Sequence, residues 1–438
     1  MFGTSGIRGP VGELVTAELA LSVGRALALT GAERVVVGRD PRESGRFLGD
    51  ALSAGLRECG TDVVRLGLAA TPTVARSVAW QDADAGVSVT ASHNPPTDNG
   101  IKLWNPSGQA FDAAQREEIT RAVEEEAFEF AGWDGTGTET RWDEAADRHV
   151  ATLVDAVEDE LDLSVVVDVG NGAGEVTADA LEALGCHVET LNAQPDGRFP
   201  ARPSEPTAEN CASLCSHVAA TDADLGIAHD GDADRMMAVD ETGAFLSGDV
   251  LMTLFARQRA NPGDVVATPV DTSLILDDVL AERDASVSRT QVGDVYVAER
   301  ATEDGVVFGG EQSGAWIWPD QTLCPDGSLA AVRLAALVDA EGPLSVLAAD
   351  VGEYPIRRTN VETDDKRGLM SRLSDAVTDR YADADTVDGV RVTLDEGWFL
   401  VRASGTQPLV RVAAEARDPE TADEVFDTAV SFVDEHRT

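Results

Sequence analysis

The sequence predicts an α/β protein with three similar α/β domains, each a mixed sheet between helices, followed by a C-terminal α+β domain. A strand–helix–strand pattern occurs three times, at residues 35–66, 165–191 and 264–289. Each time an apolar, β-branched run precedes a helix of 3.6-residue period. From residue 353 onward the pattern changes, because strands follow one another before a final helix. The length of 438 residues suits three or four domains of roughly 100–200 residues each.

The three repeats share one order of elements, and their recurrence at about the length of a domain indicates related domains. The expected elements are 35–38, 46–59 and 63–66 in the first repeat, 165–168, 174–185 and 187–191 in the second, and 264–267, 272–283 and 286–289 in the third. In the last segment we expect strands at 390–394, 398–402 and 409–412, and a helix that begins at Pro419.

A turn-rich segment, 131–142, separates the first repeat from an amphipathic helix expected near 143–160. The other boundaries follow from the spacing of the repeats. The predicted domains are 1–142, which contains Ser92; 143–248, which contains Asp230; 249–352, which contains Glu311; and 353–438, which contains Arg402.

The charge balance is strongly acidic. The chain has 34 basic and 79 acidic residues, a net charge of −45, and only two lysines, Lys102 and Lys366. An acidic, lysine-poor surface of this kind is typical of proteins from halophilic archaea, where molar salt screens the repulsion. An acidic mesophilic protein is the alternative. Either way, the charge disfavours binding to nucleic acid or to an anionic membrane, since both demand basic patches.

The five cysteines form no disulfide framework, because their number is odd and most lie in apolar segments. Cys211 and Cys215 are four residues apart in an Ala-rich segment. No Cys or His pair follows them at zinc-site spacing, so we expect a structural role. Met1 leads straight into a glycine-rich motif, and no apolar run approaches about 20 residues. The expected location is the cytoplasm.

Ser92 is the candidate nucleophile. It follows the apolar, strand-like run 86–90 and precedes His93 and an Asn-Pro bend. A strand that ends in a small polar loop presents a side chain at the mouth of an α/β sheet, where ligands usually bind. Serine alone is a poor nucleophile and needs a base or a metal ion. The alternative is that Ser92 is an ordinary turn residue. The motifs elsewhere in the chain decide between these two interpretations.

Asp230, Asp232 and Asp234 place three carboxylates at alternate positions, and carboxylate oxygens suit Mg²⁺ or Ca²⁺. A calcium EF-hand would need Gly where Arg235 stands, and the following residues, 236–240, read as a strand instead of a helix. A solvated acidic turn is the remaining alternative in so acidic a chain. Arg235 beside the carboxylates is suited to a phosphate that bridges metal and protein.

A second polar loop follows an apolar strand near the C-terminus. Arg402, Ser404, Gly405 and Thr406 combine bidentate contact, close backbone approach and two hydroxyls, as a phosphate-binding turn would. An ordinary Ser-Gly turn is equally compatible. In the loop 310–314, Glu311 and Ser313 are suited to accept from and donate to sugar hydroxyls.

Two other features of the sequence are weaker evidence for a functional site. The run 170–174 follows a strand and precedes a helix, as a dinucleotide-binding turn does, but Glu175 stands where the third glycine would be. A tight turn into a helix is the better interpretation. His229 adjoins the Asp cluster, where a supporting or core role is at least as plausible as a catalytic one.

Together these motifs resemble the α-D-phosphohexomutase family, which includes phosphoglucomutases, phosphomannomutases and phosphoglucosamine mutases. The likeness runs in order from the Gly-Thr-Ser-Gly-Ile-Arg-Gly motif at residues 3–9 to the loop at 402–406. It implies four domains around a central cleft, closed by the fourth. It also implies a phosphomutase that interconverts hexose 6-phosphate and hexose 1-phosphate, with one Mg²⁺ ion and a hexose 1,6-bisphosphate that serves as intermediate and activator.

The resemblance also implies roles for individual residues. Ser92 would carry the phosphoryl group and complete the Mg²⁺ shell with the three aspartates. Arg8, His93 and Lys102 would surround the transferring phosphoryl and manage proton transfer. Phosphoryl transfer depends mostly on positioning and charge neutralisation, which such residues provide. Substrate binding would fall to Arg235, Glu311, Ser313, Arg402, Ser404, Gly405 and Thr406.

The chain departs from the family pattern at three positions. Gln407 replaces a glutamate that usually follows the phosphate loop, Ala315 replaces a common histidine, and Val295 stands where relatives often carry a basic residue. The departures at Ala315 and Val295 bear on which sugar phosphate is the substrate. Gln312 favours glucosamine phosphate as substrate, with mannose or glucose phosphate close behind.

The sequence is also compatible with other functions. The chain is compatible with a phosphopentomutase of the same family, a Mg²⁺-dependent sugar phosphatase or a catalytically silent phosphosugar-binding protein. A closing domain argues against water, and hence against the phosphatase. A silent binder should lack the nucleophile or the metal-binding carboxylates, and both are present. The sequence does not decide between monomer and homodimer.

Overall fold

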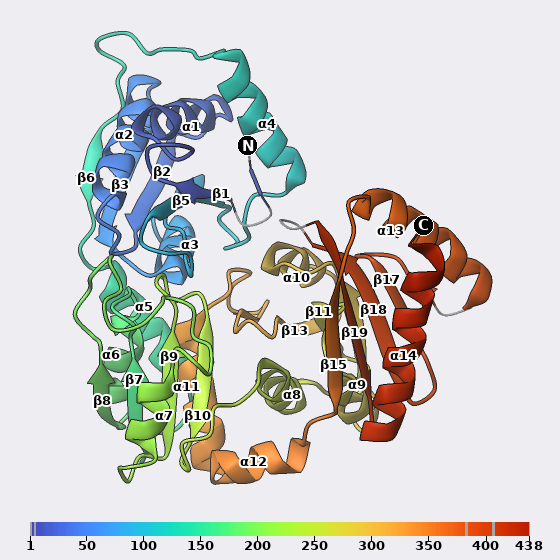
Figure 1. Cartoon of the computed structure of the whole chain (residues 1–438). Helices are drawn as coiled ribbons and strands as arrows, with labels where there is room; N and C mark the ends of the chain where they lie inside the picture. The colour runs from blue at the N-terminus through green and yellow to red at the C-terminus, as the bar shows by residue number, and fades with distance from the viewer. Residues whose placement is uncertain (1, 4–5, 382–383, 405–407, 438) are drawn as a thin grey trace. The chain divides into compact units, whose positions relative to one another are not determined.

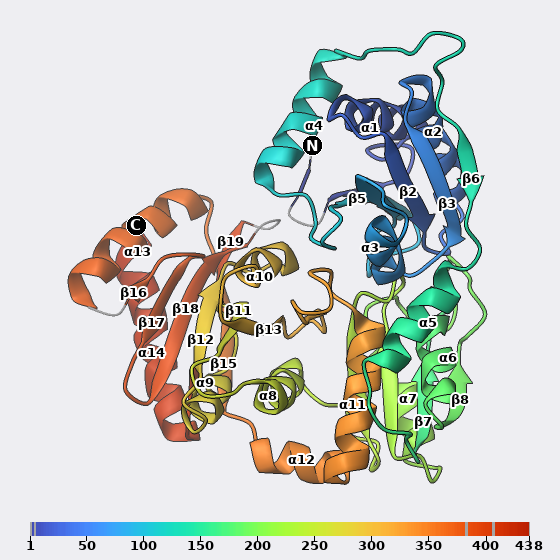
Figure 2. The same ribbon diagram turned by 180° about the vertical axis from the view of Figure 1, so that it is seen from behind.

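The computed structural model describes residues 2–3, 6–381, 384–404 and 408–437 (Figures 1 and 2). The chain forms two compact units. The first contains residues 1–251 and 313–349, and the second contains 252–312 and 350–438. Two of the three boundaries fall within helices α8 (Gly248–Arg259) and α12 (Leu344–Val351), and the third lies between residues 312 and 313. Among the described helices, none combines the length and apolarity needed to cross a bilayer.

The first sheet of the first unit has six strands in the order β1-β5-β4-β2-β3-β6. Strands β4, β2, β3 and β6 run parallel, and β5 and β1 add an antiparallel edge, so the sheet is mixed as predicted. The strands are β1 (Ile7–Pro10), β2 (Arg34–Arg39), β3 (Asp62–Leu68), β4 (Ala85–Val89), β5 (Asp98–Trp104) and β6 (Glu139–Arg141), and the helices are α1 (Ala17–Leu29), α2 (Gly45–Glu58), α3 (Thr71–Trp80) and α4 (Ala113–Glu125).

This sheet positions two loops that matter for function. Parallel strands β2 and β4 are neighbours, so the loops that leave their carboxyl ends meet at one edge of the sheet. The loop after β2 begins at Asp40, and the loop after β4 contains Ser92. Apolar residues of β2 and β4, such as Val35, Val37 and Val87, are almost fully buried and fix the edge from which both loops start.

The second sheet of the first unit has the order β10-β9-β7-β8. Its strands β9, β7 and β8 are parallel, and β10 returns antiparallel to β9, so residues 230–235 form the connection between them. Helix α5 packs against α6 and α11 (Figure 2). The strands are β7 (Ser164–Asp168), β8 (His187–Leu191), β9 (Leu225–His229) and β10 (Met236–Asp240); the helices are α5 (Ala145–Asp155), α6 (Glu175–Ala183), α7 (Ala212–Val218) and α11 (Gly327–Glu341); and the short strand β14 is Trp316–Ile317.

The second unit contains a parallel set of strands and an antiparallel sheet. Strand β11 lies between β12 and β13, parallel to both, and the C-terminal sheet has the order β15-β19-β18-β17-β16 with antiparallel neighbours. The elements are β11 (Val265–Pro269), β12 (Ser286–Thr290), β13 (Val306–Gly310), β15 (Ile356–Glu362), β16 (Ala384–Asp385), β17 (Val390–Thr393), β18 (Gly397–Ala403), β19 (Leu409–Ala416), α9 (Leu274–Ala281), α10 (Asp294–Arg300), α13 (Lys366–Arg380) and α14 (Pro419–His436).

The fold class and the three strand–helix–strand repeats are confirmed, most of them to within two or three residues. The helix predicted over 143–160 is wrong at its end, because α5 stops at Asp155. There the Ala156 N–H turns back to Leu153 O, and the Leu161 N–H pairs with Leu184 O instead of continuing the helix. The domain boundaries proposed from the sequence stay a prediction.

Candidate active site

Ser92 lies in the loop after β4 in a strained and buried position. Its φ of 51° is in the left-handed region, which few non-glycine residues adopt, and it is 1% exposed. The Ser92 N–H donates to Thr90 Oγ at 2.8 Å, which holds the turn. A left-handed residue at a buried loop persists only where its surroundings fix it.

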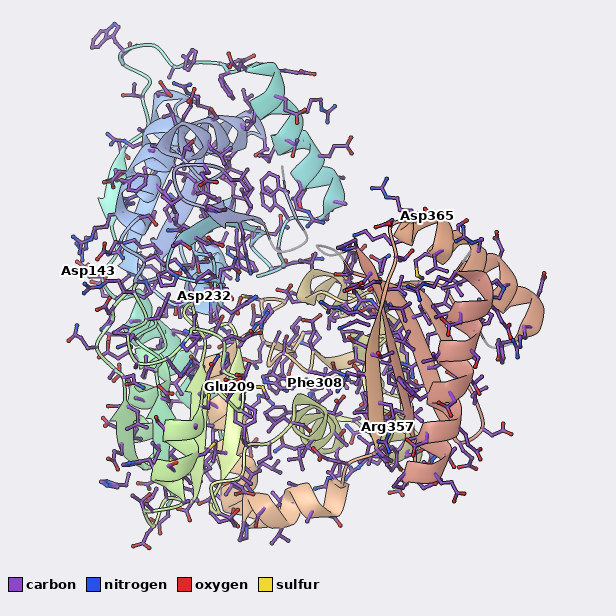
Figure 3. All side chains as sticks on the ribbon, in the orientation of Figure 1. Asp143, Glu209, Asp232, Phe308, Arg357 and Asp365 are labelled. Atoms are coloured by element: carbon purple, nitrogen blue, oxygen red, sulfur yellow. The ribbon has the colours of Figure 1, made fainter. Side chains whose placement is uncertain are left out.

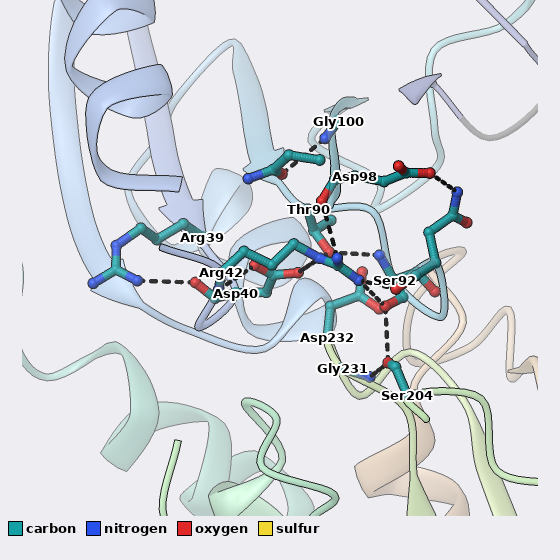
Figure 4. A network of polar contacts seen from close by, with 12 residues as sticks. Arg39, Asp40, Arg42, Thr90, Ser92, Asp98, Gly100, Ser204, Gly231 and Asp232 are labelled. Atoms are coloured by element: carbon teal, nitrogen blue, oxygen red, sulfur yellow. Dashed lines mark hydrogen bonds and ion pairs between the residues drawn. The ribbon is translucent and has the colours of Figure 1, made fainter. Parts of the chain in front are cut away.

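Arg42 supplies that fixation (Figure 4). Its guanidinium is fully buried in the loop after β2, beside the Ser92 loop. Nη2 donates to the carbonyls of Ser92 and Asn94 at 2.8 and 2.6 Å, and Nη1 donates to those of Pro95 and Asp98 at 2.6 and 2.9 Å. One side chain therefore satisfies four backbone carbonyls of the nucleophile loop.

Asp40 balances the buried charge of Arg42. Its Oδ2 accepts from Arg42 Nε at 2.9 Å and from Thr90 Oγ at 2.7 Å. Burial raises the pKa of the Asp40 carboxyl, and the Arg42 guanidinium opposes that shift. The sequence analysis missed both residues, although Asp40 and Arg42 directly follow the predicted strand 35–38, where side chains reach the edge of the sheet.

The three aspartates form one buried cluster on the β9–β10 connection. Asp232, the middle one, is labelled in Figure 3. Asp230, Asp232 and Asp234 are at most 4% exposed, and one carboxylate oxygen from each lies within 4.8 Å of the others. Ser92 Oγ donates to Asp230 Oδ2 at 2.5 Å. Ser92 and Asp230 are 138 positions apart in the sequence, and the fold brings the hydroxyl and the carboxylate cluster together in one site.

Lys102 provides the nearest positive charge. It stands on β5, and its Nζ pairs with Asp232 Oδ2 at 3.0 Å and with Asp234. Burial and the two neighbouring carboxylates raise the pKa of Asp230 well above its usual range. Burial works against ionisation of Asp232 too, but Lys102 and the Thr71 hydroxyl, 2.7 Å away, lower its pKa overall. The charges of Arg235 and Arg8 also act to lower the pKa values of Asp230 and Asp232, respectively.

A divalent cation fits this cluster. Asp232 Oδ1 is buried and has no hydrogen-bond partner among the residues that the structure describes. A buried carboxylate oxygen without a partner is costly unless a cation completes its surroundings. Aspartate oxygens are ligands that Mg²⁺ prefers. The strand β10 follows the cluster directly, which confirms the prediction of a strand over 236–240 and agrees with the rejection of an EF-hand.

Three further cationic or titratable side chains lie near Ser92. His93 Nδ1 is 3.3 Å from Ser92 Oγ. Burial, followed by the charges of Arg235, Arg8 and Lys102, lowers the pKa of His93 to about 3, so the ring is neutral near pH 7. Arg8 stands on β1 opposite Gly100, and its Nε is buried with no hydrogen-bond partner in the described chain. Arg235 Nη1 lies 3.5 Å from Glu205 Oε1.

The remaining features of the first unit have structural roles. Gly170 and Asn171, both with positive φ, make the tight turn into α6, as predicted for 170–174. His229 is fully buried between Arg235 O and the Thr177 hydroxyl, each 2.8 Å from a ring nitrogen. The one cluster of potential metal ligands found among the described residues does not include Cys211 or Cys215.

The second unit holds the predicted substrate-binding residues Glu311 and Arg402. Glu311 Oε1 accepts from the Gly293 N–H at 2.6 Å. Arg402 Nη2 pairs with Asp388 at 2.8 Å, and Arg402 Nη1 lies 3.8 Å from Asp271. Beside Arg402 is a pocket of about 170 Å³. Its lining includes three arginines, Arg358, Arg402 and Arg411, and the polar residues Asp271, Gln312, Thr359 and Asn360.

Ser404 is tied to the second lysine of the chain. Lys366 Nζ donates to Ser404 O at 2.6 Å, and the Ser404 N–H donates to Leu409 O at 3.0 Å. The sequence analysis did not anticipate a role for Lys366. Gly405 and Thr406 lie outside the described residues. Ser313 belongs to the first unit and is partly exposed.

Four family models match the chain in order. They describe phosphoglucomutase/phosphomannomutase alpha/beta/alpha domain I at residues 1–130, domain II at 147–243, domain III at 247–354 and the C-terminal domain at 359–431. The chain belongs to the phosphoglucomutase/phosphomannomutase family.

Relatives cover nearly the whole chain. Probable phosphoglucosamine mutases from Methanopyrus kandleri and Methanothermobacter thermautotrophicus are 47% and 46% identical to it, over 99% and 96% of this chain and 97% and 95% of theirs. The crystal structure of a phosphoglucomutase/phosphomannomutase family protein from Burkholderia thailandensis matches with a TM-score of 0.88 at 29% identity, over 100% of this chain and 99% of that one. Like these family members, the protein is an isomerase that moves a phosphoryl group on a hexose phosphate. The comparisons do not favour the phosphatase alternative.

Replacing Arg42 tests its role in the nucleophile loop. We expect Arg42→Met to destabilise the protein by about 3–5 kcal/mol, since it leaves Asp40 buried without its partner and four carbonyls without their donor. Arg46→Met is the matched control, because Arg46 is exposed on α2, and its effect should stay within about 0.5 kcal/mol. Urea unfolding at constant salt measures both, and equal midpoints for the two variants would contradict the assignment.

The carboxylate cluster predicts stabilisation by Mg²⁺. Raising free Mg²⁺ to a hundred times its Kd should stabilise the protein by about 2.7 kcal/mol. Asp230→Asn should abolish most of this increment without destabilising the metal-free protein, because it removes one of three mutually repelling carboxylates. Asp222→Asn, at an exposed position, should respond to Mg²⁺ as the unmodified protein does. Thermal unfolding across a Mg²⁺ titration gives the result, and an unchanged response of Asp230→Asn would exclude this site.

Proposed function

We propose that the protein is a phosphoglucosamine mutase, which interconverts glucosamine 6-phosphate and glucosamine 1-phosphate through a phosphorylated Ser92. The observation that carries the mechanism is the contact between Ser92 Oγ and Asp230 inside the carboxylate cluster. The choice of glucosamine is supported by relatives named as probable phosphoglucosamine mutases that are 42–47% identical over nearly the full chain. Gln312 agrees with this choice.

The proposed metal is one Mg²⁺ ion held by Asp230, Asp232 and Asp234, with an oxygen at Ser92 completing its shell. When bound, it would neutralise charge on the transferring phosphoryl group. The buried, unpartnered Asp232 Oδ1 supports this assignment.

The first transfer moves the phosphoryl group from Ser92 to a free hydroxyl of the hexose monophosphate. The P–O bond to Ser92 Oγ breaks as the P–O bond to the sugar oxygen forms, and the proton of the sugar hydroxyl is relayed to the departing Ser92 Oγ. His93 Nδ1, 3.3 Å from Ser92 Oγ, is the proposed relay, and because burial and neighbouring cations lower the pKa of His93 to about 3, the ring passes the proton on and does not retain it. Arg8 and Lys102 balance the negative charge of the phosphoryl group.

The second transfer returns a phosphoryl group to Ser92. The product of the first step is a hexose 1,6-bisphosphate, which presents its other phosphate to the serine after turning over. Ser92 Oγ attacks that phosphorus, the P–O bond to the sugar oxygen breaks, and the proton of Ser92 passes to that oxygen, so that the monophosphate isomer leaves. Free bisphosphate would phosphorylate Ser92 in the same way, so we expect it to act as an activator.

Residues of the second unit are assigned to the rest of the substrate. Glu311 would bind sugar hydroxyls with Ser313 of the first unit, while Arg402, Ser404, Gly405 and Thr406 would bind the phosphate that is not reacting. The arginine-lined pocket beside Arg402 supports an anion-binding role. Substrate phosphate must compete there with Asp388 for the Arg402 guanidinium. With these roles, we propose four domains, 1–142, 143–248, 249–352 and 353–438.

An intact-mass measurement tests the phosphoserine intermediate. Protein incubated with a hexose 1,6-bisphosphate and Mg²⁺ should gain the mass of one phosphoryl group, and Ser92→Ala should not. Ser107→Ala, in a turn after β5, is the control and should gain it. With glucosamine 1-phosphate, the unmodified protein should form the 6-phosphate and release no inorganic phosphate. A panel of mannose, glucose and pentose phosphates decides the substrate, and phosphorylation of Ser92→Ala would refute the proposed nucleophile.

The net charge of −45 leads to a proposal about salt. We expect the unfolding midpoint to rise steeply between low and molar KCl, because screening shortens from about 10 Å at 0.1 M to about 3 Å at 1 M and weakens the repulsion between acidic side chains. Sucrose at matched viscosity is the control. Thermal unfolding in both series is the measurement, and a midpoint independent of KCl would argue against adaptation to high salt.

A further inference from the structure

We propose that Ser204 is a positioning residue, which joins the nucleophile loop to the metal-binding loop through its hydroxyl. The inference rests on the proposed function, because it assigns the two loops the roles given above. Ser204 lies in the irregular segment between β8 and α7, away from every motif of the sequence analysis. It is 3% exposed.

The Ser204 hydroxyl makes two hydrogen bonds (Figure 4). It accepts from the Gly231 N–H at 2.8 Å and donates to Ser92 O at 2.9 Å. Gly231 stands between Asp230 and Asp232 in the carboxylate cluster, and Ser92 carries the nucleophile. The Ser204 hydroxyl, which donates its one proton and accepts with its oxygen, therefore connects the backbones of the nucleophile loop and the metal-binding loop.

The loops approach one another too closely for a bulkier link. A Cβ at Gly231 would lie 2.8 Å from Ser204 Oγ and 2.9 Å from Ser92 O. These distances are shorter than carbon–oxygen contacts allow, so a side chain there would push the loops apart. Glycine at 231 and a small hydroxyl at 204 are the combination that lets both loops meet.

The segment that carries Ser204 is itself fixed by a buried ion pair. Arg202 Nε pairs with Asp168 Oδ2 at 2.6 Å, and Arg202 Nη2 donates to His229 O at 2.7 Å. Nη1 of the same guanidinium donates to Ser204 O at 3.3 Å. Because His229 and Asp168 end strands β9 and β7, the Ser204 backbone is anchored to the second sheet.

This anchoring gives Ser204 a defined effect on the reaction. The Ser92 loop belongs to the first sheet and the Asp230 loop to the second, so the 2.5 Å contact between Ser92 Oγ and Asp230 depends on how the two sheets are held. Misplacement of a reacting group by about 1 Å can lower a rate about 100-fold. Loss of the Ser204 bridge should therefore slow phosphoryl transfer without changing how the sugar binds.

Two variants of Ser204 and one matched control test the proposal in the full-length protein. Ser204→Ala removes the hydroxyl, and Ser204→Cys fills nearly the same volume with a thiol, a weak hydrogen-bonding group. Ser77→Ala removes another fully buried serine hydroxyl, whose hydrogen bond among the described residues lies within its own helix α3, to Thr73 O. For each protein we would measure kcat and KM with glucosamine 1-phosphate, the rate of Ser92 phosphorylation by hexose 1,6-bisphosphate, and the unfolding midpoint.

We expect kcat and the phosphorylation rate to fall about tenfold or more in Ser204→Ala and to stay low in Ser204→Cys, while KM changes less than twofold. Ser77→Ala should keep the unmodified kcat. Recovery in Ser204→Cys would attribute the loss to a cavity, and an unmodified kcat in Ser204→Ala, or a loss confined to KM, would equally overturn the positioning role. If the unmodified protein and Ser77→Ala both fail to turn over every hexose phosphate offered, the proposed function fails, and this inference fails with it.

Discussion

Three carboxylates buried within 4.8 Å of one another are the constraint on which the rest of the site depends. Like charges at this separation and burial repel strongly, so they persist only where cations balance them. Lys102 balances part of the charge, and Asp232 Oδ1 has no hydrogen-bond partner among the residues that the structure describes. The cluster is therefore suited to a cation beside Ser92, and a bound cation would supply the positive charge that a transferring phosphoryl group requires.

The loops that form the site are irregular yet buried, so their backbone groups need partners other than a helix or sheet. Arginine side chains meet that need. Arg42 binds four carbonyls around Ser92, and Arg202 binds those of Asp168, Pro203, Ser204 and His229. Each guanidinium is itself paired with an aspartate, Asp40 or Asp168. Two buried ion pairs thus support reactive loops without lying in contact with the reacting atoms.

Much of the architecture could be predicted from the sequence, because continuous apolar runs indicate buried strands and regular apolar spacing indicates helices. Strand β15 could not, since its two apolar residues, Ile356 and Val361, are separated by four polar or charged ones at a partly exposed edge. Helix α13 has buried apolar residues at helical spacing, Leu369, Leu373 and Val377, but this helix was not predicted from the sequence. In the site, Ser92 and the aspartates stood in recognisable motifs. Arg42 and Ser204 did not, because their importance lies in which distant carbonyls and amides they reach.

The near absence of lysine has a practical consequence for handling the protein. Reagents that acylate lysine side chains have only Lys102 and Lys366 as targets. Lys102 is 3% exposed within the carboxylate cluster, whereas Lys366 is partly exposed and donates to the backbone beside Arg402. A fluorescent label or surface tether attached through a lysine would therefore fall preferentially near Ser404, in the part of the second unit for which we propose phosphate binding. Coupling through carboxyl groups would distribute such attachments over the acidic surface instead.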